Sequence, residues 1–250
     1  GWIGRYHAIR TKLTTMNINP SIAYRVNDRL SLGAGVSAQY IEAELTQSLD
    51  LGTVLAARGI PGAAPQALDG FGKLEGDDWG FGFNAGLLYR YNERGKIGLQ
   101  YRSPVDNTLE GDATFRVPAA AAGLQAMGLF VDTSAEADVE LPETVSLSVV
   151  QPIGEAWALL ADVTWTGWSR FEELRVNYAS GQPDSVTDES WEDVFRYSVG
   201  VNYFLNESWT LRAGTAYDET PIPDKEHRTP RIPDADRLWG SVGATYRCSE

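Results

Sequence analysis

Apolar residues recur at every second position in eight or nine stretches of this chain, which are joined alternately by short polar turns and by long loops. Between Trp79 and Tyr91 every odd-numbered residue is aromatic or aliphatic, whereas the even-numbered residues are small or polar, apart from Leu88. Successive side chains of a strand point to opposite faces, so one face of this segment suits lipid and the other suits a polar lumen. The pattern predicts the wall of an all-β, antiparallel transmembrane β-barrel.

About nine strands of this kind are expected. Several are longer than the ~5–6 residues typical of a soluble sandwich and match the ~10 residues of a tilted strand that crosses a bilayer. A soluble β-sandwich also alternates, but the regular succession of short and long connections favours the barrel. The expected strands cover residues 11–26, 30–40, 79–91, 96–102, 139–152, 157–166, 195–205, 209–218 and 237–247.

Tryptophan and tyrosine gather at both ends of these strands, as the two membrane interfaces require. One set lies beside the short turns and the other lies toward the long loops. The first set is Tyr24, Tyr89, Tyr91, Trp157, Tyr203, Trp209 and Tyr246, and the second is Tyr40, Trp79, Tyr101, Trp165 and Tyr217.

Composition narrows the function classes. A hydrophobic share of 43% and a mean hydropathy of −0.27 do not reveal a membrane protein, and no apolar run approaches the ~20 residues of a membrane-spanning helix. The net charge of −13 disfavours nucleic acid and anionic membrane surfaces as partners. With His7, His227 and Cys248 as the only histidines and cysteine, an internal disulfide is impossible and a metal site of these residues is not expected.

The chain opens on Gly1 without a basic or apolar leader and stops just after a strand-like run, so we expect a piece of a longer protein. Residues 1–250 are then a single β-barrel domain that is incomplete at both ends.

Three segments resemble the FadL/TodX-type family of outer-membrane long-chain fatty acid transport proteins. The most specific runs from Trp191 through Trp209 to Arg228-Thr-Pro-Arg-Ile-Pro-Asp-Ala-Asp-Arg-Leu-Trp239. The others are residues 19–35, and Ile97-Gly-Leu-Gln-Tyr-Arg-Ser103 followed by Leu141-Pro-Glu-Thr-Val145. The matches extend over nearly the whole chain.

This resemblance implies a fourteen-stranded barrel plugged by an N-terminal hatch, of which the chain supplies about the fourth to the twelfth strand. It also implies passive uptake of long-chain fatty acids or other hydrophobic compounds, aromatic hydrocarbons included, across a Gram-negative outer membrane. Ligands first bind a groove on two extracellular loops, then a tighter site in the lumen, and leave sideways at a kinked early strand. The hatch, the kinked strand and the last two strands have no counterpart here. We expect no cofactor, outer-membrane lipid as surroundings, and a monomer.

Two loops, residues 49–73 and 117–130, are apolar enough to form that groove. They could equally pack on each other as a cap over the barrel, and a groove between packed helices allows both. The candidate groove residues are Leu51, Val54, Leu55, Phe71, Leu124, Met127 and Phe130.

A carboxylate head group needs a cation beside an apolar slot, and lumen-side Arg102, Arg196 and Arg212 are the candidates. They could instead pair with lumen carboxylates such as Asp162 and Asp218. The proline-rich segment with Arg228, Arg231, Asp234 and Arg237 is expected to fold onto the barrel mouth, where it could also meet incoming anions. The acidic residues Asp184, Asp188, Glu189, Glu192 and Asp193 follow no calcium-loop spacing, so a solvated loop is expected.

The sequence leaves one other function class open, an adhesive barrel, and disfavours another, an enzyme. A structural or adhesive barrel, whose loops bind partners without transport, has the same wall. An enzyme is not expected, because neither histidine lies near a Gly-x-Ser-x-Gly motif and no phosphate loop or metal-ligand spacing is present.

Overall fold

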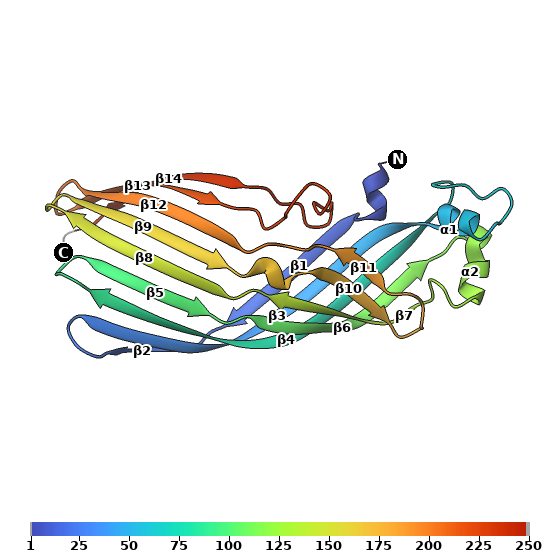
Figure 1. Ribbon diagram of the computed structural model, residues 1–250, viewed down its shortest axis with the longest axis horizontal. Coiled ribbons are helices and arrows are strands. Elements are labelled where there is room, and N and C mark those ends of the chain that lie inside the picture. Colours follow the sequence, from blue (N-terminus) through green and yellow to red (C-terminus); the bar gives the residue numbers. More distant parts are fainter. Residues whose placement is uncertain (1, 249–250) are drawn as a thin grey trace.

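A computed structural model describes residues 2–248, and these form one antiparallel sheet of fourteen strands with short helices at one end (Figure 1). When strands that continue one another are taken as one pass, successive passes along the chain are neighbours in the sheet, which is the order of an up-and-down wall. The strands are β1 (Arg10–Ile18), β2 (Ser21–Arg25), β3 (Leu30–Asp50), β4 (Asp69–Arg90), β5 (Lys96–Arg102), β6 (Val105–Arg116), β7 (Thr133–Leu141), β8 (Thr144–Ile153), β9 (Trp157–Thr166), β10 (Glu173–Tyr178), β11 (Ser185–Asp188), β12 (Val194–Phe204), β13 (Trp209–Asp218) and β14 (Arg237–Tyr246).

The fourteen strands make nine passes, because five passes are each interrupted once. In each of these, two consecutive strands continue one another beside the same neighbours: β1 with β2, β5 with β6, β7 with β8, β9 with β10, and β11 with β12. Prolines mark three of the interruptions, at Pro20, Pro104 and Pro142, where a strand lacks an N–H for its neighbour. The predicted number of passes is therefore confirmed.

One end of the sheet carries short turns with a shared local device (Figure 1). In three of them an asparagine side chain accepts hydrogen bonds from the backbone N–H groups two and three residues later. Asn27, Asn92 and Asn206 hold these turns, so residues that favour turns for this reason fix where each hairpin reverses.

The half of the sheet next to these turns is apolar outside and polar inside. Phe83, Leu99 and Leu211 are 51%, 41% and 40% exposed, which places them on the outer face as the alternation predicted. Rows of such residues align across the sheet in register, and a soluble protein rarely exposes so large an apolar surface. One row is Leu32, Leu87, Leu99, Leu147, Val163, Tyr197, Tyr217 and Leu238.

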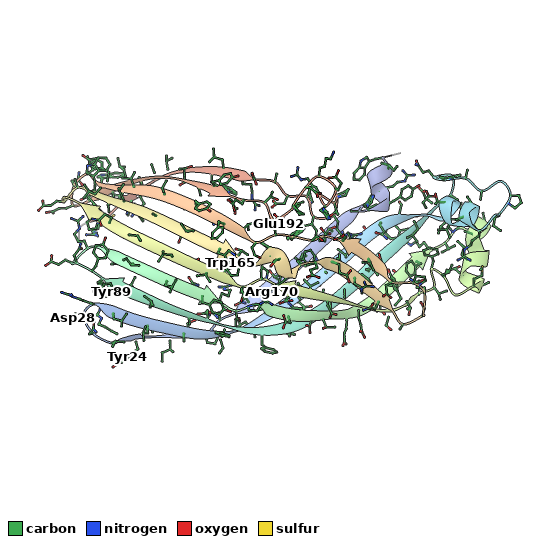
Figure 2. All side chains as sticks on the ribbon, in the orientation of Figure 1. Tyr24, Asp28, Tyr89, Trp165, Arg170 and Glu192 are labelled. Atoms are coloured by element: carbon green, nitrogen blue, oxygen red, sulfur yellow. The ribbon has the colours of Figure 1, made fainter. Side chains whose placement is uncertain are left out.

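The apolar band has the height of a bilayer core. Trp79 and Tyr89 lie ten residues apart on β4, which is about 33 Å along a strand. With a tilt of about 40° this spans about 25 Å, the height of the apolar band of outer-membrane barrels. Figure 2 shows Tyr24 and Tyr89 at the short-turn end and Trp165 near the middle of the molecule, so the sheet continues well beyond the second aromatic belt.

Beyond the cross-strand pair Tyr40 and Trp79 the two faces exchange character. Carboxylates now occupy the outer face, with Glu42, Asp77, Glu110 and Glu136 aligned across four strands. Apolar side chains fill the inner face, where Ala113, Ala135 and Val176 are buried together with Leu74, Phe115, Ala137 and Tyr178 around them.

This exchange explains where the strand boundaries were wrong. The expected strands ended at Tyr40 and began again at Trp79, whereas β3 runs on to Asp50 and β4 begins at Asp69. Backbone pairing continues without a break while the surroundings change from lipid to water, so alternation of one sense marks only the part within the bilayer. The upper strands β6, β10 and β11 and most of β7 were missed for the same reason.

The described helices are short and lie at the end opposite the short turns, with α1 (Leu51–Ala57) and α2 (Ala122–Ala126) in the two long loops (Figure 1). Single 3-10 turns occur at η1 (Ile3–Tyr6), η2 (Ala119–Ala121) and η3 (Trp168–Arg170). Among residues 2–248 no helix has the length and apolarity to cross a membrane.

Replacing the outward Val199 on β12 with arginine tests the orientation of the wall. We expect Val199→Arg to lower the free energy of unfolding in lipid vesicles by about 2–4 kcal/mol, because a charge then faces acyl chains near the midplane. The measurement is a urea titration of the full-length protein that contains this chain.

The matched control is Ser198→Arg, one residue away on the lumen face, which should cost much less. Equal losses for the two variants would contradict the assigned faces.

Candidate functional site

The two long loops pack against each other at the end of the sheet beyond the second aromatic belt. Leu51 of α1 and Leu124 of α2 are fully buried together with Ala121, so the interpretation of the loops as a cap is confirmed. Asp50 starts α1 by accepting hydrogen bonds from the Thr53 N–H at 2.9 Å and the Thr53 hydroxyl at 2.7 Å.

The other predicted groove residues have three different positions. Val54, Leu55 and Phe130 pack around the buried core of the cap. Met127 is 61% exposed, with its sulfur 3.9 Å from the Arg58 guanidinium. Phe71 lies outside the cluster, within β4 and under the Arg116 guanidinium, which is 5.5 Å from the ring centroid. The structure therefore unites five of the seven predicted residues around one apolar cap.

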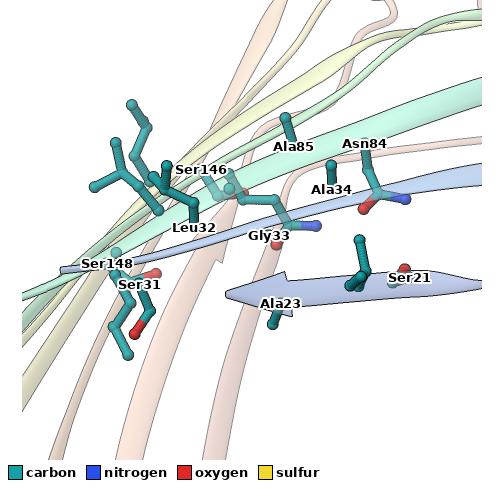
Figure 3. A pocket seen from close by; sticks show the side chains of 17 residues that line it. Ser21, Ala23, Ser31, Leu32, Gly33, Ala34, Asn84, Ala85, Ser146 and Ser148 are labelled. Atoms are coloured by element: carbon teal, nitrogen blue, oxygen red, sulfur yellow. The ribbon is translucent and has the colours of Figure 1, made fainter. Parts of the chain in front are cut away.

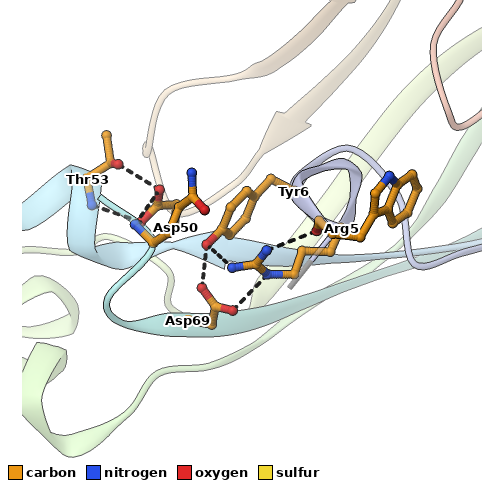
Figure 4. A network of polar contacts seen from close by, with 7 residues as sticks. Arg5, Tyr6, Asp50, Thr53 and Asp69 are labelled. Carbon is orange, nitrogen blue, oxygen red and sulfur yellow. Dashed lines mark hydrogen bonds and ion pairs between the residues drawn. The ribbon is translucent and has the colours of Figure 1, made fainter. Parts of the chain in front are cut away.

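The N-terminal turn η1 is tied to the base of the first loop by a polar network (Figure 4). Arg5 Nε donates to Asp69 at 2.9 Å, and the Tyr6 hydroxyl donates to the other Asp69 oxygen at 2.6 Å. These bonds hold the pKa of the Asp69 carboxyl below its usual value, and burial together with Asp69 raises the pKa of Tyr6 to about 12. The network fixes Ile3 and Tyr6 beside the loop core.

An apolar cavity of about 470 Å³ lies between η1 and this loop core. Its walls include Ile3, Tyr6, Leu49, Val54 and Phe130, so two of the predicted groove residues face it. This volume is within the range of small-molecule binding sites. The cap is filled, and the open space lies beneath it.

Two smaller cavities continue this space along the inner face of the sheet. Tyr6, His7 and Gln47 line both the apolar cavity and a more enclosed polar chamber of about 160 Å³. Leu45, Leu74 and Val176 line both that chamber and an apolar slot of about 40 Å³. Because they share lining residues, the three hollows lie next to one another, and we call this row the path.

Arg231 supplies a positive charge to the polar chamber. One guanidinium nitrogen, Nη2, donates to the His7 carbonyl at 2.6 Å and to Gln47 Oε1 at 2.7 Å. The other, Nη1, is buried and has no hydrogen-bond partner among the described residues. Burial lowers the pKa of this guanidinium, so the chamber contains a poorly solvated cation.

The predicted head-group arginines lie lower in the wall. Arg212 donates to the Thr245 hydroxyl, whereas Arg102 and Arg196 stand on the exposed inner face of β5 and β12. Asp218 pairs with Arg237 at 3.3 Å, and Asp162 accepts hydrogen bonds from Ser148 and Thr164. A concavity of about 480 Å³ in the bilayer half is lined by small and polar residues such as Ser31, Asn84 and Ser146 together with apolar ones such as Leu32 and Leu99 (Figure 3). None of the three arginines lines this concavity or the path above it.

The proline-rich segment folds onto the mouth as expected. Arg231 reaches β3 through Gln47, and Arg237 pairs with Asp218 and with Asp234 at 3.5 Å. The expectation of a solvated acidic loop was wrong for Glu189, which is 0% exposed. Charge composition could not reveal this, because one carboxylate of the five turns inward while Asp184 pairs with Arg175 at the surface.

The residues of the path that sequence reasoning missed are mostly on the upper strands and on η1. Leu45, Gln47, Leu74 and Val176 alternate with charged or polar neighbours in the opposite sense to the bilayer half. That second alternation is the signal by which they could have been found.

The whole chain, residues 1–250, matches the family described as outer membrane protein transport protein (OMPP1/FadL/TodX). The chain belongs to this family. The long-chain fatty acid transport protein of Escherichia coli O6:H1 is 36% identical over 96% of the chain and 57% of that protein. The 47 kDa outer membrane protein of Pasteurella multocida is 37% identical over 98% of the chain and 58% of that protein.

Solved structures agree with the family on the fold. A crystal structure of a Pseudomonas aeruginosa FadL homologue superposes with a TM-score of 0.87 at 30% identity, over 99% of the chain and 59% of that structure. The Ralstonia pickettii toluene transporter TbuX, at 20% identity and a TM-score of 0.62 over 84% of the chain and 59% of that structure, shows the fold alone. The chain thus spans less than two thirds of these relatives and forms part of a FadL-type barrel wall in the outer membrane.

Asp69→Asn should loosen the N-terminal turn. The pKa of Asp69 is lowered in the folded state, so its contribution is present above the ordinary aspartate pKa of about 4 and is lost as the pH falls through the lowered value. We expect faster amide hydrogen exchange in residues 3–8 of the variant at pH 7. As the pH falls below the lowered pKa of Asp69, the exchange rate of these amides in the native protein, corrected for intrinsic exchange, should approach that of the variant.

The control is Asp28→Asn in the turn after β2, which leaves the network intact (Figure 2). Unchanged exchange in Asp69→Asn would contradict the role of the network.

Proposed function

We propose that this chain forms the ligand-conducting part of a barrel for passive uptake of long-chain fatty acids or other hydrophobic compounds across the Gram-negative outer membrane. The observation that carries the proposal is the path from the apolar cavity under the cap to the chamber with Arg231. No cofactor and no covalent change of the ligand take part.

An amphipathic ligand would use the two parts of the path differently. Its hydrocarbon chain gains free energy by leaving water for the apolar walls, at roughly 25 cal/mol for each Å² buried. A carboxylate would replace the missing partner of Arg231 Nη1 by a charge-assisted hydrogen bond. Arg102, Arg196 and Arg212 then remain predicted contacts farther along the lumen.

The names of the relatives support this substrate range. Those at 31% to 36% identity include long-chain fatty acid transport proteins, and solved structures of the same fold include toluene transporters. The position of a cation in the path favours an acyl carboxylate among the ligands of this chain. An adhesive barrel is the second candidate, and its loops would bind partners without conducting a ligand.

Replacing Arg231 tests the head-group contact. We expect Arg231→Gln to weaken binding of dodecanoate by roughly 10- to 100-fold, since hydrogen bonds to charged groups contribute about 1.5–3 kcal/mol. Calorimetric titration of the full-length protein in detergent measures the dissociation constant.

The matched control is Arg228→Gln, an exposed arginine of the same segment, which should bind dodecanoate like the native protein. Similar weakening in both variants would show a general charge effect and would contradict a specific contact.

Narrowing the cavity beneath the cap separates transport from adhesion. We expect Val54→Trp to slow uptake of dodecanoate into vesicles several-fold, because the larger side chain fills space between η1 and the loop core. Met127→Trp on the exposed side of the cap is the control and should leave uptake unchanged. Native uptake in the Val54 variant would favour the adhesive alternative.

A further inference from the structure

One buried ionisable group near the path has no part in the proposed function. Glu189 is 0% exposed, and its Oε2 atom accepts a hydrogen bond of 3.3 Å from the Trp191 indole N–H. Its Oε1 atom is buried and lacks a hydrogen-bond partner within the described part of the chain. A carboxylate in such a place costs free energy unless it is neutral or meets a positive charge.

The backbone holds Glu189 in this position. It lies in the interruption between β11 and β12, where the N–H groups of Glu189 and Ser190 both donate to the Glu172 carbonyl, at 2.9 and 2.8 Å. Ser190 has a φ of +43°, a left-handed conformation that is uncommon for serine. Trp191 packs beside it against Phe171 and Ile222. The chain therefore reverses locally in a way that keeps this one carboxylate inside.

Of the positive charges that act on Glu189, Arg231 lowers the pKa of its carboxyl the most. Each influences the other's charge, yet no ion pair within 4.0 Å joins them in residues 2–248. Arg231 Nη1 and Glu189 Oε1 are thus a buried donor and a buried acceptor, both without partners among the described residues, and Arg231 lines the chamber of about 160 Å³.

Several other groups act on the same pair. Burial raises the pKa of Glu189 and Asp188 adds to the rise, whereas Trp191, Arg231 and His227 oppose it. Tyr178 lies near Arg231 from β10. An anion placed on Arg231 would offset the main positive charge that lowers the pKa of Glu189 and would add a second negative charge, so the pKa of Glu189 would rise further.

We propose that Glu189 is a specificity-determining counter-ion of Arg231, which takes up a proton from solvent when Arg231 binds the carboxylate of a ligand. Without ligand, the negative charge of Glu189 and the positive charge of Arg231 offset each other inside the protein. With ligand, the acyl carboxylate stays ionised on Arg231 and Glu189 becomes a neutral acid. The inference rests on the proposed function and assigns Glu189 a positioning role that acts through Arg231.

The consequence is that the preference for a carboxylate over a neutral ligand depends on pH. Because binding of an anion consumes a proton, affinity for a carboxylate falls as the pH rises through the range in which free Glu189 is ionised, by up to tenfold per pH unit. A neutral ligand of the same length does not consume a proton and binds equally well throughout. Glu189 thereby disfavours anions at high pH without contact with the ligand.

Calorimetry of the full-length protein with dodecanoate and dodecanol, between pH 6 and 9, tests this coupling. Titrations in buffers of different ionisation enthalpy give the number of protons taken up. We expect uptake of up to one proton with dodecanoate and none with dodecanol. Glu189→Gln should abolish the uptake, flatten the pH profile and bind dodecanoate up to roughly tenfold more tightly at pH 8.

Glu192→Gln is the control, since Glu192 is an exposed carboxylate of the same segment and should behave like the native protein (Figure 2). Binding of dodecanoate without proton uptake would overturn the inference and leave the proposed function standing. Failure of the native protein to bind either probe would overturn both. If Glu189→Gln does not fold, the number of protons taken up by the native protein with dodecanoate still tests the inference.

Discussion

Backbone pairing that continues from lipid into water is the constraint on which the rest of this structure depends. A strand in a bilayer must satisfy its N–H and C=O groups in the sheet, and β3 and β4 keep the same register for 21 paired positions through the change of solvent. Side chains must therefore change character while the backbone does not. Below Tyr40 and Trp79 the outer face is apolar, and above them it carries carboxylates.

The inner face becomes more apolar where the outer face becomes charged, and this change forms the candidate site in the upper half of the sheet. In the bilayer half, glycines, serines and Asn84 share the lining of an open concavity with leucines, whereas in the upper half Leu45, Leu74 and Val176 enclose apolar space. The interruptions in five passes lie between the two halves and allow local departures from strand geometry. One of them turns Glu189 inward, and the loop after β13 brings Arg231 to Gln47 of β3.

A poorly solvated cation that lacks one hydrogen-bond partner within residues 2–248, beside an apolar path, suits the proposed uptake, in which a ligand is first bound and later released. A fully paired and hydrogen-bonded cation would gain little from a carboxylate, whereas an isolated buried cation would bind it too strongly for release. Arg231 lies between these limits, because two of its hydrogen bonds are made, one nitrogen lacks a partner, and Glu189 offers a competing charge. The same compromise is imposed on any conduit that conducts by diffusion alone.

The sequence by itself determined the wall: its nine passes, the face of each bilayer residue, the short turns at Asn27, Asn92 and Asn206, and both aromatic belts. It could do so because alternation and turn preference are local properties, which act between residues a few positions apart. It also indicated that the two apolar loops gather, although not that they fill their own core and leave the cavity beneath it.

Only the tertiary structure decided the upper strands and the site. The interior of the upper half is defined by which strands surround it, so Leu45 and Val176 become lining residues through partners far away in the chain. The approach of Arg231 to Gln47 joins positions 184 residues apart, and one glutamate among five acidic neighbours is buried because a distant carbonyl accepts its backbone N–H. The local sequence pattern does not predict the Arg231–Gln47 contact or the burial of Glu189. Their free energy depends on desolvation and on charges that only the fold brings together.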